Sequence, residues 1–406
     1  MPIDSTSDVP AASALSRRRF LPLAGAAGLV AVAPRVFGHD GDRRAAAARF
    51  VYVGTYTAPD VPPGGTHPSA AVGISVFRMS PHDGGLSLVQ VVTASNPSYL
   101  ALNPSLTRLY SVNENLAGGV SAYAINPANG QLAFLNSASA DGKHTTHLSV
   151  HPSGQYLMAA NYSSGNYPVF RLLADGRIGP KTADFQGVGN GTGANPDRQE
   201  GPHAHQIVTD PGAHHVFGVD LGADRVNVLN LEPGAGTLAP NTVPFANSAS
   251  GSGPRHMAFH PNGVLAYVLN ELVSSIDVHR YDPARGALVW MQTISTLPRD
   301  FTGNNTTAEI RVHPSGRFLY NTNRGHDSVA MFEIEGDGTL DSLGWVSSGG
   351  QWPRGMNIDP SGTFLYAANQ NTDTIRVFRI GHNGQLHHST FVHTPTPVDV
   401  EFGATV

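Results

Sequence analysis

The sequence predicts an all-β chain that folds as a seven-bladed β-propeller with four-stranded antiparallel blades. The main observation is a recurring phrase. A His-Pro, Asp-Pro or Asn-Pro pair and a turn, usually with Gly, precede an apolar, β-prone run that ends in Asn or Asp. A period of roughly 50 residues, with Gly, Pro and Asn turns between short strands, is typical of propellers. The six copies span residues 103–113, 151–161, 210–220, 260–270, 313–323 and 359–369.

The composition agrees with this fold and excludes several classes of protein. The chain has 406 residues with 45 Gly and 30 Pro, and 40% of its residues are apolar, which suits many tight turns and is too apolar for disorder. The net charge is −5 and there is no basic stripe, so we expect no nucleic-acid partner. The absence of Cys excludes disulfides, thiolate chemistry and Cys-based metal sites.

The N-terminus is predicted to be a targeting segment. Residues 16–21 read Ser-Arg-Arg-Arg-Phe-Leu, a twin-arginine pattern, and a weakly apolar stretch follows that ends in Ala31-Val32-Ala33, a small-residue cleavage signal. This stretch is too short to span a bilayer. We expect export by the twin-arginine machinery to the periplasm or outside the cell, without membrane attachment after cleavage. The alternative is a disordered tail with chance arginines. The predicted segments are a signal peptide (1–33), a linker (34–48) and the propeller (49–406).

The two ends of the propeller are predicted to meet in one blade. The run Arg49–Tyr56 resembles the closing strand of each repeat but lacks the Pro-containing start, and Thr394–Phe402 alternates like a strand. A ring has to cover its two free edges, and pairing of the terminal strands does so. Within a repeat, alternating runs such as 328–334 and 343–346 flank an Asx-Gly turn, which is a hairpin signal. A two-sheet sandwich would not explain the constant internal order of the repeats.

Candidate site residues lie just before each Pro-led strand or just after its closing residue. Loops on one face of a propeller bring such positions from many blades together around the channel. His203 and His205 form a His-x-His pair that places both imidazoles on one side of a strand, and no other repeat has this pair. The full set is Arg198, His203, His205, Arg255, Glu271, Glu309, Arg324, Arg354 and His147, and Glu114 occupies a comparable place.

Structural readings of the same residues compete with these functional ones. Asn and Asp at strand ends mostly bond backbone groups in turns. The His of each His-Pro pair (His151, His260, His313) is replaced by Asp or Asn in sister repeats, so we read it as structural. The selected charges could each be solvated surface groups. A His-x-His pair near a Glu could bind a metal, but no second ligand pair is present and the arginines would repel a cation. We therefore expect no metal and no cofactor.

Together these phrases resemble the seven-bladed β-propeller lactonase family, which includes bacterial 6-phosphogluconolactonases of propeller type and fungal 3-carboxy-cis,cis-muconate lactonizing enzymes. The resemblance covers about residues 50 to 402. It implies an active site on one face of the channel, with His205 favoured, then Arg255, Glu271 and Arg324. The matching phrases are 52–56, 146–150, 198–205, 253–256, 270–272, 308–310, 323–328 and 352–354.

The residue types suit the opening of an ester, so we expect a lactonase, a carboxylic ester hydrolase acting on a sugar lactone. Arg255 and Arg324 would bind a carboxylate or the oxyanion, and His205 or Glu271 would do the acid–base work. Arg198, His203, Glu309, Arg354 and His147 would contact the substrate. No Gly-x-Ser-x-Gly elbow is present, so we expect no acyl-enzyme.

Two other functions remain open at this stage. One is a muconolactone-type lactonizing lyase that uses the same residues, and the other is a non-catalytic exported binding propeller. The named sugar-phosphate enzymes work in the cytoplasm. The expected export therefore makes a non-phosphorylated aldonolactone a further candidate substrate.

Export is testable through the arginine pair. Replacing Arg17 and Arg18 by Lys keeps the charge but removes the twin-arginine pattern, so the precursor is expected to stay in the cytoplasm. Cell fractionation and immunoblotting of the full chain would show this. Normal export of the Arg17→Lys/Arg18→Lys variant would refute the twin-arginine interpretation.

Overall fold

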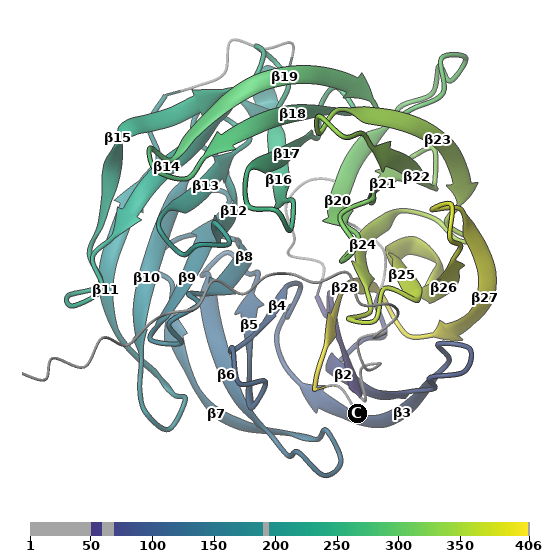
Figure 1. Cartoon of the computed structure of the whole chain (residues 1–406). Coiled ribbons are helices and arrows are strands. Elements are labelled where there is room, and N and C mark those ends of the chain that lie inside the picture. Colours follow the sequence, from purple (N-terminus) through teal and green to yellow (C-terminus); the bar gives the residue numbers. More distant parts are fainter. Residues whose placement is uncertain (1–49, 59–68, 190–194, 405–406) are drawn as a thin grey trace, which may run out of the picture. The chain divides into compact units, whose positions relative to one another are not determined.

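A computed structural model describes residues 50–58, 69–189 and 195–404. The predicted signal peptide and linker lie outside these ranges. Seven four-stranded antiparallel sheets surround a central channel (Figure 1), which confirms the predicted propeller. The described residues also form two short 3-10 helices, η1 (Pro196–Arg198) and η2 (Gln370–Thr372). In the same ranges, no helix has the length and apolar character needed to cross a membrane.

The first four blades each run from an inner strand at the channel to an outer strand. Blade 1 consists of β28 (Pro397–Phe402), β1 (Phe50–Thr55), β2 (Gly73–Met79) and β3 (Leu86–Thr93). Blade 2 consists of β4 (Leu100–Leu102), β5 (Arg108–Asn113), β6 (Gly119–Ile125) and β7 (Leu132–Ser139). Blade 3 consists of β8 (Thr145–Val150), β9 (Tyr156–Asn161), β10 (Asn166–Leu172) and β11 (Ile178–Gln186). Blade 4 consists of β12 (Ala204–Thr209), β13 (Val216–Asp220), β14 (Arg225–Leu231) and β15 (Leu238–Asn247).

The remaining three blades keep the same order. Blade 5 consists of β16 (Pro254–Phe259), β17 (Leu265–Asn270), β18 (Ser275–Asp282) and β19 (Ala287–Ser295). Blade 6 consists of β20 (Thr306–Val312), β21 (Phe318–Arg324), β22 (Ser328–Ile334) and β23 (Leu340–Ser347). Blade 7 consists of β24 (Pro353–Ile358), β25 (Phe364–Asn369), β26 (Thr374–Ile380) and β27 (Leu386–His393). The Pro-led run of each repeat is therefore the second strand of its blade.

The ring closes as predicted, because the C-terminal strand β28 is the inner strand of blade 1. It pairs antiparallel with β1 in a register that joins Val51 to Phe402 and Val53 to Val400. Figure 1 shows β28 beside the N-terminal strands of the same blade. Val398, Val400 and Phe402 are buried there. No free inner edge remains in this blade, which is the purpose of such a closure.

A tyrosine in the second strand explains part of the repeated phrase. In six blades its hydroxyl donates to a carbonyl in the outer hairpin of the next blade, as Tyr366 does to Gly84 at 2.6 Å across the closure. Blade 4 has Phe217 in the corresponding stretch. Each of these six hydrogen bonds links a blade to the next one, and the tyrosine ring that donates it is buried. The other donors are Tyr52, Tyr110, Tyr156, Tyr267 and Tyr320.

The inner strands carry a β-bulge near their first residues. In β12 the register with β13 skips from Ala204 to Gln206, and in β16 the register with β17 skips from Pro254 to His256. A bulged residue is left out of the pairing, and its side chain can be re-aimed. Equivalent skips occur in β8, β20 and β24, and the skipped residues are Thr146, His205, Arg255, Ala308, Glu309 and Arg354. Five of these six side chains line cavities of the channel.

Removal of β28 is expected to destabilise the whole ring. Deletion of residues 395–406 exposes the edge of β1 and removes three buried apolar side chains, each worth about 1.5–3 kcal/mol. This loss is comparable with a typical total stability of about 5–15 kcal/mol. A control that lacks only residues 404–406 keeps β28 and is expected to melt like the full chain. Equal thermal midpoints for the two truncated proteins would contradict the role of β28.

Candidate active site

The predicted site residues meet at one mouth of the channel, formed by the beginnings of the inner strands. Antiparallel pairing brings the start of each inner strand beside the end of the second strand, as in Pro254 opposite Asn270. The bulged residue and the residue after the closing Asn therefore share one edge of the blade. A small cavity of about 30 Å³ opens there. It is lined by Glu114, Thr146, Tyr162, Arg198, His205, Glu271, Arg324 and Arg354, which come from blades 2 to 7.

The carboxylate of Glu271 is the centre of this mouth. Its Oε1 lies 3.0 Å from Arg198 Nη2 and 3.2 Å from Arg324 Nη2, and its Oε2 lies 3.1 Å from Arg255 Nε. Only 3% of Glu271 is exposed. Burial alone would raise its pKa, but Arg324, Arg198 and Arg255 together hold the pKa far below its usual range. Glu271 therefore stays ionised and holds together three cations from three blades.

Aromatic rings and carbonyls fix the arginines in place. Arg198 lies over the ring of Tyr162 at 5.7 Å and donates to its hydroxyl at 2.8 Å. Arg324 lies over the Trp352 ring at 5.5 Å. Such cation–π contacts orient a guanidinium without neutralising it. Arg255 donates to the carbonyl of Ala308, and Arg324 donates to that of Thr307 at 2.7 Å. We call the group formed by Arg198, Arg255, Arg324, Arg354, Glu271 and His205 the arginine mouth.

His205 is a neutral imidazole within the arginine mouth. Its Nε2 lies 4.0 Å from Glu271 Oε2, and its buried Nδ1 has no hydrogen-bond partner among the described residues. Its ring meets those of Tyr162 and His256 edge to face. Burial, and then the positive charge of Arg255, lowers the pKa of His205 well below its usual value of 6.5. A nitrogen lone pair is therefore available to accept a proton at neutral pH.

His203 does not share this position, contrary to the expected geometry of the His-x-His pair. It precedes β12, and the bulge at His205 breaks the alternation on which that expectation rested. The His203 ring stacks on Tyr162 at 4.6 Å, with Nδ1 3.1 Å from the Tyr162 carbonyl oxygen and Nε2 3.0 Å from Glu200 Oε1. His203 therefore supports the ring that carries Arg198 and lies outside the cavity lining.

The other predicted residues are divided between two levels of the channel. Arg354 lines the arginine mouth, 4.0 Å from Glu114 Oε1 and over the Tyr56 ring. Glu309 lies deeper, with Oε1 3.2 Å from His256 Nδ1. His147 is deeper still in the channel, where its ring packs against His256. Neither Glu309 nor His147 lines the mouth cavity.

Glu114 is a site residue that the selection from sequence omitted. Its Oε2 accepts hydrogen bonds from Tyr56, at 2.8 Å, and from Ser98, while its buried Oε1 has no hydrogen-bond partner within the described ranges. Glu114 follows the closing residue Asn113 just as Glu271 follows Asn270, and that parallel is the sequence signal for it. Tyr162 follows Asn161 in the same way.

The arginine mouth carries a surplus of positive charge. Four guanidinium groups and the neutral His205 face the carboxylates of Glu271 and Glu114. In the part of the chain that the structure describes, no three His, Asp or Glu side chains gather as a metal site would require. Such a mouth is complementary to an anion or to a developing oxyanion.

The chain is similar to several known proteins of one family. A family model described as lactonase, 7-bladed β-propeller, matches residues 50–402. The 6-phosphogluconolactonase of Bacillus subtilis (strain 168) is 37% identical over 306 residues, which cover 75% of this chain and 83% of that protein. The structure of a periplasmic gluconolactonase from Pseudomonas aeruginosa has a TM-score of 0.81 and 31% identity, covering 88% of this chain and 99% of that one. A Lactobacillus plantarum protein reaches 0.79 with 31% identity, covering 88% and 100%.

The chain therefore belongs to the lactonase, 7-bladed β-propeller family, as the resemblance in its sequence suggested. The expected enzyme class, a carboxylic ester hydrolase that opens lactones, is the class of the named relatives.

Replacing Glu271 by Gln is expected to cost about 3–5 kcal/mol of folding free energy, because it leaves buried guanidinium groups without their counter-charge. Urea denaturation of the two proteins would measure the difference. Glu333→Gln is the matched control: its carboxylate is exposed and lies 4.0 Å from Arg317, so a change of about 0–1 kcal/mol is expected. Similar losses in both variants would show that Glu271 does not hold the arginines together.

Proposed function

We propose that this protein is a lactonase that hydrolyses a six-carbon sugar lactone at the arginine mouth. The observation that carries the proposal is the buried Glu271 carboxylate, which holds Arg198, Arg255 and Arg324 beside the neutral imidazole of His205. This combination offers fixed cations for an oxyanion and a base for water at the same place. A propeller that only binds a ligand would not require the two together.

The reaction assigns separate tasks to these groups. Water attacks the lactone carbonyl carbon while His205 accepts the proton from water. The carbonyl oxygen becomes negative, and Arg255 and Arg324 stabilise it. Buried Arg324 Nε has no hydrogen-bond acceptor among the described residues and is free to donate to this oxygen. The bond from the carbonyl carbon to the ring oxygen then breaks, and that oxygen takes the proton from His205 to give the hydroxy acid.

Of the two candidate bases, we favour His205. Both carboxylate oxygens of Glu271 contact arginines, so Glu271 acts as the holder of the arginines, whereas His205 Nδ1 has no hydrogen-bond partner among the described residues and can accept a proton. Burial lowers the pKa of Arg324 to about 9, with Glu271 opposing, so its guanidinium is still charged at neutral pH. The cations that would stabilise the oxyanion are therefore in place before the reaction begins.

The lactone has to displace water and one arginine to enter. A cavity of about 30 Å³ holds about two water molecules, at about 10–15 Å³ each. Arg198 has 22% of its side chain exposed, compared with 4% for Arg255 and 5% for Arg324. We therefore expect the side chain of Arg198 to move outward when substrate binds.

Two substrates fit this proposal. The surplus of positive charge favours an acidic substituent, as in the phosphorylated lactone of the named Bacillus relative. Export by the twin-arginine route, which we propose for this chain, would favour a non-phosphorylated aldonolactone, and the periplasmic gluconolactonase of Pseudomonas supports that choice. The test is acid release by the purified mature chain from gluconolactone, its 6-phosphate and a muconolactone. Hydrolysis of either sugar lactone is expected, and inactivity on both would refute the function.

Arg255→Ala is expected to lower kcat by about 10²–10³-fold, because removal of one oxyanion donor typically has this effect. KM should change little if the contact forms mainly in the transition state. Arg317→Ala, at an exposed site outside the mouth, is the control and is expected to keep the wild-type rate. A higher KM with unchanged kcat would instead assign Arg255 to substrate binding alone.

The pH profile provides a test of His205. Its base form is lost as pH falls through its folded-state pKa, which burial lowers well below 6.5. We therefore expect kcat/KM to stay constant from neutrality to below pH 6.5 before it falls. The His205→Ala variant should be slower and should lack this acid limb. An inflection at or above pH 6.5, or an unchanged profile in the variant, would exclude His205 as the base.

A further inference from the structure

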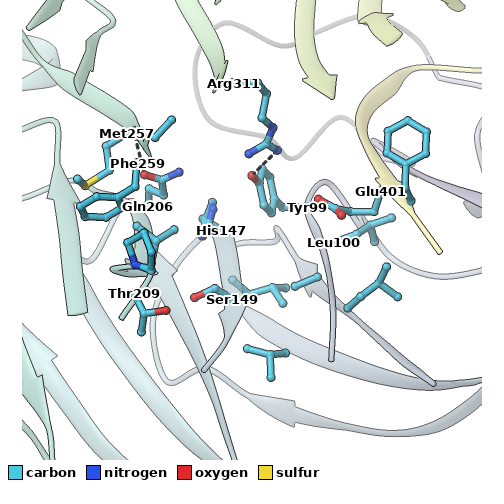
Figure 2. A pocket seen from close by; sticks show the side chains of 18 of the residues that line it. Tyr99, Leu100, His147, Ser149, Gln206, Thr209, Met257, Phe259, Arg311 and Glu401 are labelled. Carbon is cyan, nitrogen blue, oxygen red and sulfur yellow. Dashed lines mark hydrogen bonds between the residues drawn. The ribbon is translucent and has the colours of Figure 1, made fainter. Parts of the chain in front are cut away.

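The channel contains a second, larger cavity at the opposite end of the inner strands. Its volume is about 570 Å³, within the range of about 300–1,000 Å³ that is usual for small-molecule sites. The ends of β4, β8, β12, β16, β20 and β28 form its walls (Figure 2). We call it the lower cavity. It shares no lining residue with the cavity of the arginine mouth, and a layer that includes His256 and Glu309 lies between them.

The walls of the lower cavity combine apolar and polar side chains. Met257 and Phe259 supply much of one side, and Leu100 and Phe402 supply part of the other. The polar members are Tyr99, His147, Ser149, Gln206, Thr209, Arg311 and Glu401, and Figure 2 shows these side chains around the same space. An apolar pocket with a few converging polar groups is the usual form of a ligand site.

Carboxyl groups outnumber cations at this end of the channel. Arg311 Nη1 lies 3.6 Å from Glu309 Oε1, and its charge also acts on Asp399 and Glu401. Among the described residues, no cationic nitrogen lies within ion-pair distance of Glu401, whose carboxylate accepts from the Asn357 amide, at 3.5 Å from Oε1, and from the backbone N–H of Phe402. Burial, and then the charge of Glu401, raises the pKa of Asp399 well above its usual value. Glu309 also has His256 at 3.2 Å, so Glu401 is the carboxyl group of this set that lines the cavity without an ion pair among the described residues.

An unused hydrogen-bond donor points to an occupant of the same space. Gln206 is 1% exposed and lines the lower cavity. Its Oε1 accepts from the Met257 N–H at 2.7 Å, but its amide nitrogen has no acceptor among the described residues. This amide nitrogen is a donor on the lining of the cavity, where water or a ligand can accept its hydrogen bond. This observation is independent of the charge balance.

We propose that the lower cavity binds a small organic cation, a primary amine with an apolar carbon chain and an oxygen atom. Its ammonium group pairs with Glu401, its chain packs on Met257 and Phe259, and its oxygen accepts a hydrogen bond from Gln206. A metal ion fits less well, because the described residues hold no cluster of three His, Asp or Glu ligands. The proposal stands apart from the lactone chemistry of the arginine mouth.

The affinity for an amine is expected to depend on pH in a defined direction. Burial raises the pKa of Glu401 to about 7, with Arg311 opposing and Glu309 reinforcing the shift. Tyr99 and the neutral ring of His147 also line this side of the cavity, and Asp399, which does not line it, acts electrostatically on Arg311. Because the ammonium pairs with the ionised carboxylate, binding strengthens as pH rises through about 7, and it releases up to one proton when it occurs below that pH.

Isothermal titration calorimetry with 6-aminohexan-1-ol as the probe tests this proposal. Hexane-1,6-diol and 6-hydroxyhexanoate have nearly the same length and are neutral and anionic, so they isolate the effect of charge. We expect the amine alone to bind, at least about tenfold more tightly at pH 8 than at pH 5.5. Equal binding of the diol, or tighter amine binding at pH 5.5, would overturn the proposal.

Two variants test whether the amine binds in the lower cavity. Glu401→Gln removes the carboxylate, and Thr209→Phe fills the cavity from the wall formed by β12 while leaving Glu401 intact. Both are expected to abolish binding, and thermal melting shows whether each is folded. If Glu401→Gln fails to fold, Thr209→Phe decides the question. His205→Ala, at the other mouth, should keep the amine affinity. Binding that survives Thr209→Phe or disappears in His205→Ala would refute the assignment.

Discussion

The ion cluster around Glu271 is the interaction on which the rest of this site depends. Its carboxylate contacts guanidinium groups contributed by the loop before β12, by β16 and by β21, so three blades are joined at one buried point. Buried cations of this kind are costly unless a counter-charge is within contact distance. The closed ring of blades brings these residues to one mouth, and the carboxylate keeps the arginines directed toward one place. The proposed lactone chemistry therefore depends on the closed ring of blades, which holds these residues together.

The bulges of the inner strands connect the backbone to this chemistry. A regular strand would alternate its side chains between the two faces of the blade, each packed against a neighbouring blade. The extra residue near the start of β12, β16 and β24 is left out of the pairing, and His205, Arg255 and Arg354 occupy these places. The same β-bulge recurs in the inner strands of several blades. The side chain at each bulge decides whether that blade contributes to the site.

Much of the fold and part of the site could be predicted from the sequence. The repeated Pro-led phrase defined the blades and the terminal strands defined the closure, because both depend on local turn chemistry and alternation. The expectation that loops on one face of a propeller meet around the channel also brought Arg255 and Glu271 together. The bulges have no comparable sequence signal, and without them His203 and His205 were expected on one side of a strand. The role of Glu271 as holder or base depends on distances to three arginines that no spacing reveals.

The lower cavity illustrates a different limit of sequence reasoning. Met257, Phe259 and Leu100 look like ordinary core residues of inner strands, and Glu401 looks like a solvated strand end. Only the arrangement of the inner strands around the channel shows that they enclose a space and that Arg311 serves several carboxyl groups. The two ends of one channel thus differ in their ionisable groups, with surplus cations at the arginine mouth and surplus carboxyl groups below.

The proposed function requires that the lactone is bound and opened at the arginine mouth. A crystal structure of the protein with the hydroxy-acid product tests this claim most directly. The account predicts that the product carboxylate lies between Arg255 and Arg324 and beside His205, with Arg198 displaced from Glu271. A product found in the lower cavity, or bound at neither mouth while the Glu271 cluster stays intact, would contradict it.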